Sequence, residues 1–418
     1  MTGDTIADWL EKHAEEMVEL QSRLTAIPAL NPESDGTGEW EKAESLKQYL
    51  ADFGFPEPEH YDTPDERVPR NSRPNFVVRI PGKQSEPRIW VMTHLDVVPP
   101  GERTEDDDWK GWDSDPYRVR RDDDRIYGRG VEDNQQALVA GVFAAQALLE
   151  HDIMPHHEVA LLFVSGEETG SEYGLQHLLA NHADLFSPDD LIMVPDAGNE
   201  DGSIIEIAEK SVLWLTFHIE GKQAHGSMPQ LAHNAFRAGA QLACALDEEL
   251  HKQFDKKDEL FSPPYSTFEP TRHGPNVPNI NTIPGEEKIS FDCRVLPDYD
   301  LDEILGVIRG EMERIDSGIG TKTNLQIENR LDAPEPTRQD APIVRMLQKA
   351  LRETRQVEGK LTGIGGSTVA AFFRQAGYPV VVWSTSEGFA HQVNENCRIS
   401  NMVADARVFA HIFRQQLP

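Results

Sequence analysis

The chain has 418 residues, which is longer than a single hydrophobic core usually grows, so two domains are expected. It carries 72 acidic and 40 basic side chains, a formal net charge of −32, and this imbalance excludes nucleic acid as a partner. No apolar run approaches the roughly 18 residues of a membrane span, and the acidic start of the chain does not resemble a signal peptide, which excludes a membrane partner and predicts a cytoplasmic protein.

The acidic side chains gather in clusters, for example at residues 105–108 and 122–124. Self-repulsion of this size destabilises a compact state unless ions screen it. We therefore interpret the composition as an adaptation to very high salt; a well-solvated surface without any such adaptation is the alternative.

The three cysteines, Cys244, Cys293 and Cys397, lie far apart in the sequence. Their spacing is typical neither of a disulfide framework nor of a C-x-x-C zinc site. Each is therefore predicted to be a buried thiol.

After a helical start, apolar β-like runs alternate with helical stretches from Asn75 to Met193. The β-like runs lie at residues 76–80, 89–93, 159–164 and 191–194, and the helical stretches include 135–150 and 174–181. This alternation is typical of an α/β domain with a mostly parallel sheet covered by helices.

The order of elements changes between Ser211 and Glu328. A strand, a helix, two strands, a helix and a strand are predicted at 212–219, 233–252, 265–268, 288–295, 301–315 and 324–327. This is the β-α-β-β-α-β order of a ferredoxin-like unit. The α/β pattern then resumes with a helix at 341–353, a strand at 380–383 and a final helix at 402–415. We therefore expect a phosphorylase/hydrolase-like catalytic domain in two parts, 1–210 and 331–418, and an α+β lid domain inserted at 211–330.

Side chains that bind metals follow the ends of several predicted strands, where open α/β sheets bind their ligands. His94 and Asp96 end one strand, Glu167 and Glu168 follow a second, and Asp196 follows a third. A carboxylate two residues after a histidine can hold its second ring nitrogen in the correct tautomer. Two adjacent carboxylates are unfavourable unless a cation neutralises them, so one could bind metal while the other acts as a base.

Two further residues complete this pattern. Asp133 precedes the predicted helix at 135–150, where an N-cap is the simpler explanation, and His391 follows the strand at 380–383 through a glycine-containing loop. Several such residues in order along one sheet are hard to assign to packing. Mixed nitrogen and oxygen ligands for two metal ions would come from His94, Asp133, Glu168, Asp196 and His391, if Asp133 bridges the ions.

Five segments in this order, THLDVVP, YGRGVED, SGEETG, PDAG and FAHQVNE, resemble the aminoacylase/carboxypeptidase family of two-zinc hydrolases. The family includes succinyl-diaminopimelate desuccinylases, acetylornithine deacetylases and glutamate-releasing carboxypeptidases. The resemblance extends over nearly the whole chain, from Asp8 to Val408, and implies two divalent ions about 3.5 to 4 Å apart. Zinc is the expected metal, and cobalt or manganese would also suit these ligands.

The resemblance also implies a role for each residue of the site. Asp133 would bridge the ions, with His94 and Asp196 on one ion and Glu168 and His391 on the other. Asp96 would orient His94. Glu167 would be the general base that takes a proton from the attacking water and passes it to the leaving amine.

Lid residues are implied by the same resemblance. His225, in the segment GKQAHGS, would reach the active site of a second subunit and stabilise the oxyanion, which implies a homodimer through the lid domain. Asn281 and Arg294 would hold the carboxylate of the substrate, a role that suits the bidentate fork of arginine. Outside the resemblance, His225 and Arg294 could each be surface residues. The loop with Gly365 and Gly366, placed before a helix, could offer backbone N–H groups to an anion.

Two segments depart from the family pattern, the loop after Gly366 and the residues 134–136 that follow Asp133. Neither change touches a predicted ligand. The predicted function is hydrolysis of an amide bond in an N-acyl amino acid or short peptide with a free carboxylate, with desuccinylation first. Deacetylation and peptide cleavage are alternatives within this class, and a non-catalytic acidic scaffold is an alternative of another class, which retention of Glu167 disfavours.

Overall fold

The computed structural model describes residues 5–105 and 108–417. Asp106 and Asp107 of the first acidic cluster therefore lie outside the described residues, as do the first four residues. Within the described ranges, no helix combines the length and the apolar character that crossing a membrane requires.

The chain divides into two compact units. The larger unit contains the described residues up to Ile207, then Thr337–Leu361 and the chain from Phe372 onward. The smaller unit contains Ala208–Pro336 and Thr362–Ala371. The second segment of the smaller unit falls in a stretch that the sequence places in the catalytic domain. Hydrogen bonds hold this segment in the smaller unit. One of them, 2.9 Å long, runs from the Lys210 N–H to the carbonyl oxygen of Ile364.

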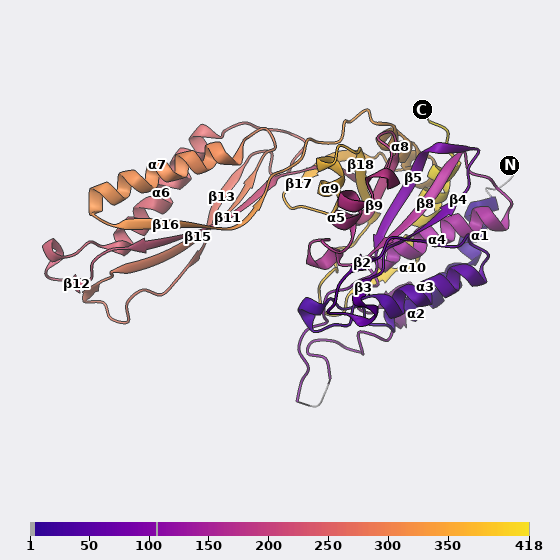
Figure 1. The fold of residues 1–418 in the computed structure, drawn as a ribbon, viewed down its shortest axis with the longest axis horizontal. Coiled ribbons are helices and arrows are strands. Elements are labelled where there is room, and N and C mark those ends of the chain that lie inside the picture. Colours follow the sequence, from indigo (N-terminus) through magenta and orange to yellow (C-terminus); the bar gives the residue numbers. More distant parts are fainter. Residues whose placement is uncertain (1–4, 106–107, 418) are drawn as a thin grey trace. The chain divides into compact units, whose positions relative to one another are not determined.

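An eight-stranded mixed sheet forms the centre of the larger unit (Figure 1). Its strands, in spatial order, are β1 (Glu59–His60), β4 (Phe76–Ile80), β8 (His157–Val164), β5 (Gln84–His94), β9 (Leu191–Asn199), β18 (Val380–Thr385), β10 (Ile204–Glu209) and β17 (Lys360–Ile364). The neighbours β8, β5, β9 and β18 are parallel, whereas β1, β4 and β10 pair antiparallel with their partners. The central strands contain long apolar, buried runs, such as residues 159–164 of β8 and 380–383 of β18, as strands covered on both faces must.

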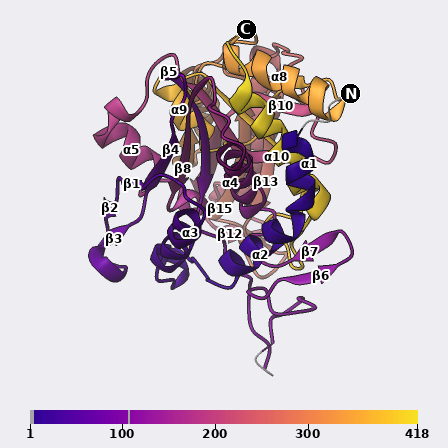
Figure 2. The ribbon, with the colours of Figure 1, turned by 90° about the vertical axis from the view of Figure 1, so that its right-hand side faces the viewer.

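Helices complete the larger unit, and α4 packs against both α10 and α2 (Figure 2). They are α1 (Thr5–Lys12), α2 (Ala14–Thr25), α3 (Trp40–Asp52), α4 (Gln135–Glu150), α5 (Leu175–Asn181), α8 (Pro342–Arg355), α9 (Ala370–Gln375) and α10 (Ile399–Arg414). In α4, every residue from Gln135 to Leu148 is buried, and its small and apolar side chains allow contact on all sides.

Short elements connect these layers. The two-stranded and three-stranded ribbons of the larger unit are β2 (Thr63–Pro64) with β3 (Ser72–Arg73), and β6 (Arg120–Asp122) with β7 (Arg125–Tyr127) and β19 (Asn396–Arg398). Single turns of 3-10 helix occur at Pro32–Ser34, Pro69–Asn71, Glu167–Thr169, Ala183–Leu185 and, in the smaller unit, Pro229–Leu231.

The smaller unit has the predicted ferredoxin-like order. Its antiparallel sheet runs β13 (Thr267–His273), β15 (Glu286–Val295), β11 (Ser211–Glu220) and β16 (Lys322–Leu331), with helices α6 (Ala235–Gln253) and α7 (Leu301–Ile319) and the ribbon of β12 (Ala224–His225) and β14 (Thr282–Ile283). Alternate residues of the strands, such as Leu213, Leu215 and Phe217, pack with the two helices into one core. The predicted fold class, a mostly parallel α/β sheet with a separate α+β lid, is therefore confirmed.

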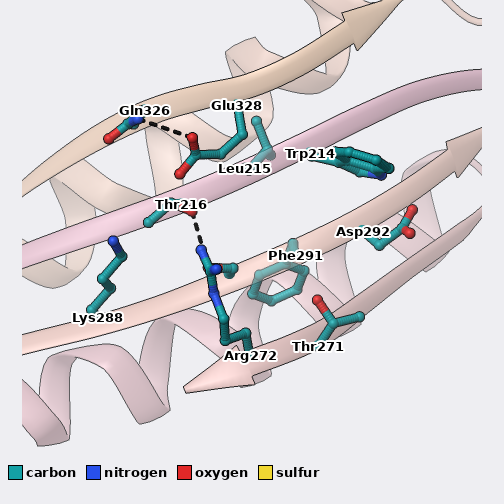
Figure 3. Close-up of a pocket in the computed structure, with 11 residues that line it drawn as sticks. Trp214, Leu215, Thr216, Thr271, Arg272, Lys288, Phe291, Asp292, Gln326 and Glu328 are labelled. Atoms are coloured by element: carbon teal, nitrogen blue, oxygen red, sulfur yellow. Dashed lines mark hydrogen bonds between the residues drawn. The ribbon is translucent and has the colours of Figure 1, made fainter. Parts of the chain in front are cut away.

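The other face of the smaller sheet is polar. Figure 3 shows Trp214, Arg272, Lys288, Asp292 and Glu328 around an open pocket of about 590 Å³ on this face. Along β11, the polar Thr216 and His218 alternate with the core residues Leu215, Phe217 and Ile219, so this strand turns one face to the apolar core.

Some sequence predictions were wrong in detail. Cys244 is exposed, while Cys293 and Cys397 are buried as predicted. The buried stripe of α6 contains Ala238, Leu242 and Leu246, and a residue two positions after Leu242 points away from that stripe. Strand β13 runs to His273, beyond the end predicted for this strand at Phe268.

Candidate metal centre

The parallel strands bring four of the predicted site segments to one edge of the large sheet. His94 is the last residue of β5, and Asp196 lies in β9 beside it. Glu167 and Glu168 form the 3-10 turn after β8, and His391 follows β18. Because β8, β5, β9 and β18 are parallel neighbours, their carboxyl ends meet at the same edge.

Asp133 lies between two histidines. Its Oδ1 atom is 3.1 Å from Nε2 of His94, and its Oδ2 atom is 3.1 Å from Nε2 of His391. Asp133 comes one residue before Asn134, the N-cap of α4, and its own side chain caps no helix. Each carboxylate oxygen thus faces one imidazole, which is the arrangement required of a bridging ligand.

The remaining predicted ligands extend this arrangement on either side. Asp196 Oδ1 is 3.3 Å from Nε2 of His94, and Glu168 Oε2 is 3.0 Å from Nε2 of His391. The structure therefore brings all five predicted ligands close together, with Asp133 and Asp196 beside His94, and Asp133 and Glu168 beside His391.

This donor set fits divalent cations. Two imidazoles and several carboxylates suit zinc, cobalt or manganese. Among the described residues, the buried Oε1 atom of Glu168 has no hydrogen-bond partner. An unpaired buried carboxylate oxygen is costly, and a metal ion would satisfy it.

Glu167 lies beside two of the predicted ligands. A carboxylate oxygen of Glu167 is within 4.8 Å of ligand atoms of both His94 and Asp196. Burial, followed by repulsion from Asp196, raises the pKa of the Glu167 carboxyl well above its usual range. A carboxylate with a raised pKa beside the ligands can accept and return a proton, and on distance alone it could also be a ligand.

Asp96 has two roles, only one of which the sequence predicts. His94 Nδ1 is 3.0 Å from the carbonyl oxygen of Asp96 and 3.5 Å from its carboxylate, so the carbonyl is the closer partner of the ring. The Asp96 carboxylate instead accepts hydrogen bonds from the N–H groups of Glu167, at 3.1 Å, and Glu168, at 3.0 Å. Asp96 therefore holds the turn with the adjacent glutamates in place as well as the histidine.

Asn31 supports Asp96, a contact that no sequence pattern indicates. Its Nδ2 atom donates to Oδ2 of Asp96 at 2.8 Å, and its own Oδ1 accepts from the buried Arg73. Asn31 lies in none of the quoted motifs. A single asparagine before a proline is common in turns, so it does not mark a site residue.

In the smaller unit, His225 and Asn281 lie together. Strand β12, which ends at His225, pairs with β14, and the N–H of Gly226 donates to the carbonyl oxygen of Asn281 at 2.7 Å. The exposed His225 ring accepts a hydrogen bond at Nδ1 from the N–H of Ser227, at 3.2 Å. An N–H can only donate, so the neutral ring carries its proton on Nε2, which makes that atom a donor.

Arg294 also lies in the smaller unit, where the structure gives it protein partners. Its Nε and Nη2 atoms donate to the two oxygens of Asp292 at 2.6 and 2.9 Å, and Nη1 donates to the carbonyl oxygen of Gly365 at 3.0 Å. The bidentate edge that a substrate carboxylate would need is therefore occupied by Asp292.

The glycine loop that Arg294 contacts is open. At Gly365 and Gly366, a Cβ would meet nothing within 4 Å. Further along the loop, the N–H of Thr368 donates to the carboxylate of Glu209 at 3.0 Å. This N–H group therefore already has an anionic partner within the chain.

The pKa values of the two site histidines reflect the surrounding carboxylates. Hydrogen bonds to Asp133 and Glu168 raise the pKa of His391 to about 10. Burial lowers the pKa of His94, but hydrogen bonds to Asp133 and Asp196 outweigh it and raise the pKa well above its usual range. Without metal, both imidazoles are therefore protonated at neutral pH, and metal binding must displace those protons.

We therefore expect zinc binding to release protons, and zinc affinity to rise as the pH increases. The stability of the metal-free fold should instead fall as the pH rises. Protonated His391 stabilises the fold fully below the unfolded-state pKa of about 6.5, and this contribution is lost as the pH rises towards about 10. Calorimetric titration of chelator-treated protein in two buffers of different ionisation enthalpy counts the protons, and thermal unfolding follows the stability. Zinc binding without proton release would contradict the expectation.

Comparisons with known proteins indicate the family. Residues 90–415 match the family described as peptidase family M20/M25/M40. The chain is 38% identical over 417 residues to an uncharacterized metallohydrolase of Methanocaldococcus jannaschii, covering 96% of this chain and 99% of that protein. It is 28% identical over 326 residues to a succinyl-diaminopimelate desuccinylase of Helicobacter hepaticus, covering 77% and 78% of the two chains.

Solved structures show the same fold. The aminopeptidase PepT from Bacillus cereus superposes with a TM-score of 0.74 at 17% identity, covering 96% of this chain and 98% of that one. The profile match and the archaeal relative extend over most of the sequence. This chain is therefore a metallohydrolase that belongs to peptidase family M20/M25/M40.

Proposed function

We propose that the protein hydrolyses the amide bond of an N-acyl amino acid or a short peptide that carries a free carboxylate. The observation that carries the proposal is the position of Glu167, whose carboxylate lies beside the ligand atoms of His94 and Asp196. Burial keeps the pKa of Glu167 high, so this group is suited to transfer a proton at neutral pH.

Five residues of this chain would hold the metal ions: Asp133 between them, His94 and Asp196 on one side, and Glu168 and His391 on the other. Two divalent ions, zinc in the first instance, would polarise the scissile carbonyl and acidify the attacking water. Glu167 accepts the proton of that water and returns it to the nitrogen of the leaving amine. Asp96 keeps Glu167 in reach through the N–H group of that residue.

Desuccinylation of an N-succinyl diamino acid is the first specific candidate. It is supported by relatives named succinyl-diaminopimelate desuccinylase, including one of Nitratiruptor that is 23% identical over 96% of this chain. Deacetylation of N-acetyl amino acids and cleavage of dipeptides are the rival reactions. Because Asp292 occupies the bidentate edge of Arg294, the carboxylate of the substrate must displace Asp292 or bind elsewhere.

A substrate panel tests the proposal. The zinc-loaded, cobalt-loaded and manganese-loaded protein is assayed with N-succinyl diamino acids, N-acetyl amino acids and dipeptides, and release of the free amine is measured. We expect hydrolysis of at least one class, with N-succinyl substrates giving the highest kcat/KM. If the fully loaded protein released no amine from any class, amide hydrolysis would be rejected in favour of a non-catalytic scaffold.

His225 is proposed to stabilise the oxyanion in the partner subunit of a homodimer formed through the smaller unit. We expect His225→Ala to lower kcat by about 10²- to 10³-fold, because removing one oxyanion donor has that effect in other hydrolases. A mixed dimer of His225→Ala and Glu167→Gln chains should regain activity, since one of its two sites then combines an intact Glu167 with an intact His225. Recovery that does not exceed the sum of the two variants would contradict a role across subunits.

The excess of acidic side chains supports a further proposal, adaptation to high salt in the cytoplasm. We expect dialysis from molar to millimolar potassium chloride to lower the melting temperature and the activity, because repulsion at a net charge of −32 is then unscreened. Thermal unfolding at several salt concentrations measures the effect. An unchanged melting temperature would contradict the adaptation.

A further inference from the structure

Two glutamates next to the proposed ligands have no role in the chemistry described so far. Glu132 precedes Asp133, and Glu395 lies four residues after His391. Glu132 is 9% exposed and Glu395 is 0% exposed. Buried carboxylates are costly unless several hydrogen bonds satisfy them, so their partners are informative.

The Glu395 carboxylate holds the loop that carries Asp133. Its Oε1 atom accepts from the N–H groups of Glu132 and Asp133, both at 3.0 Å. Its Oε2 atom accepts from the N–H of Gly130 at 3.0 Å and from Nη1 of Arg129 at 2.6 Å. One buried side chain thus fixes the backbone of the bridging ligand itself, across 262 residues of sequence.

The Glu132 carboxylate holds the loop that carries His391. Its Oε1 atom accepts from the N–H of Glu387 at 2.7 Å, and its Oε2 atom accepts from the N–H of Phe389. A weaker interaction reaches the N–H of Ala390, the residue directly before His391.

The loop with His391 needs such support. His391 has a φ of 62° and Asn394 a φ of 56°, both in the left-handed region. A residue other than glycine is strained in this region, so the conformation persists only where the surroundings impose it. Pairing of β7 with β19 joins the two loops at their outer ends, and the two glutamates join them next to the ligands.

We propose that Glu132 and Glu395 are positioning residues that set the affinity of the metal centre. Glu132, next to Asp133, holds the backbone of the loop that carries His391. Glu395, in the loop that carries His391, holds the backbone around Asp133. The inference rests on the ligand set of the proposed function and is independent of the substrate. Glu132 acts on His391 alone, whereas Glu395 acts on Asp133, whose two oxygens face both histidines.

Zinc titration of the full-length, chelator-treated protein tests the proposal, with a competing chelator to separate the two binding steps. We expect Glu132→Gln to weaken one of two zinc ions by about 10- to 100-fold, as loss of a ligand-orienting group does, and to leave the other unchanged. Glu395→Gln should weaken both ions. Glu387→Gln is the matched control, because this carboxylate lies in the same loop but accepts from the side chains of Arg125 and Arg398, at 3.0 Å each.

The proposal would be overturned if a folded Glu132→Gln chain bound zinc with wild-type affinities. It would also be overturned if Glu387→Gln lost as much zinc affinity as Glu132→Gln. Circular dichroism of the metal-free variants shows whether each is folded, and Glu132→Asp provides a second variant that keeps the charge but shortens its reach. If zinc binding follows the expected pattern and no amide is cleaved, the proposed function fails while the positioning role stands.

Discussion

Replacing Glu167 by glutamine is expected to lower kcat by about two to four orders of magnitude, the contribution of a positioned general base, while both metal ions stay bound. Glutamine has nearly the same shape but cannot accept the proton of the attacking water. The wild-type carboxylate is within 4.8 Å of ligand atoms of His94 and Asp196, so retention of the ions separates a base from a ligand. Steady-state kinetics on the best panel substrate and metal analysis after dialysis provide the two measurements.

Glu168→Gln is the matched control for this experiment. Glu168 adjoins Glu167 in the same turn, and its N–H group also donates to Asp96, but its Oε2 atom faces His391 at 3.0 Å. This variant should lose or weaken one ion along with activity. If Glu167→Gln lost an ion while Glu168→Gln kept both, the roles of the two residues would be exchanged, and full activity in Glu167→Gln would refute the mechanism.

The sequence predicts the fold class and the grouping of the ligands because both depend on periodic, local patterns. Apolar runs such as that ending at His94 indicate buried parallel strands, and parallel strands place their carboxyl ends at one edge. The predicted ligands lie together for this reason. The motif containing Asp133 adds the bridging residue, which the strand pattern alone would assign as a helix cap.

What the sequence missed depends on contacts between distant segments. Asn31 reaches Asp96 across 65 positions, and no local pattern marks it. Arg294 and Asp292 lie on the same face of one strand and pair through their side chains. The sequence does not predict this pairing, because an arginine at that position could equally point to solvent or to substrate. Glu132 and Glu395 lie inside quoted motifs, yet their partners become visible only when the two loops are brought together.

Removing the carboxylate that we propose as the bridging ligand, Asp133, should have the largest effect of any single change at the site. We expect Asp133→Ala to weaken both ions and to lower turnover by about 10³-fold or more, because metal ions contribute several kcal/mol of transition-state stabilisation. Asp196→Ala is the control, since its carboxylate lies 3.3 Å from His94 and should affect one ion only.

The Asp133→Ala variant should also change the pKa of His391 in the metal-free protein. A hydrogen bond to Asp133 is the largest cause of the raised His391 pKa of about 10, so in metal-free Asp133→Ala that pKa should fall towards the usual histidine range. Nuclear magnetic resonance titration of the histidine ring protons measures it directly. Because this readout needs neither metal nor substrate, an unchanged His391 pKa would show that Asp133 does not lie between the histidines, and the two-ion centre would then lack its shared ligand.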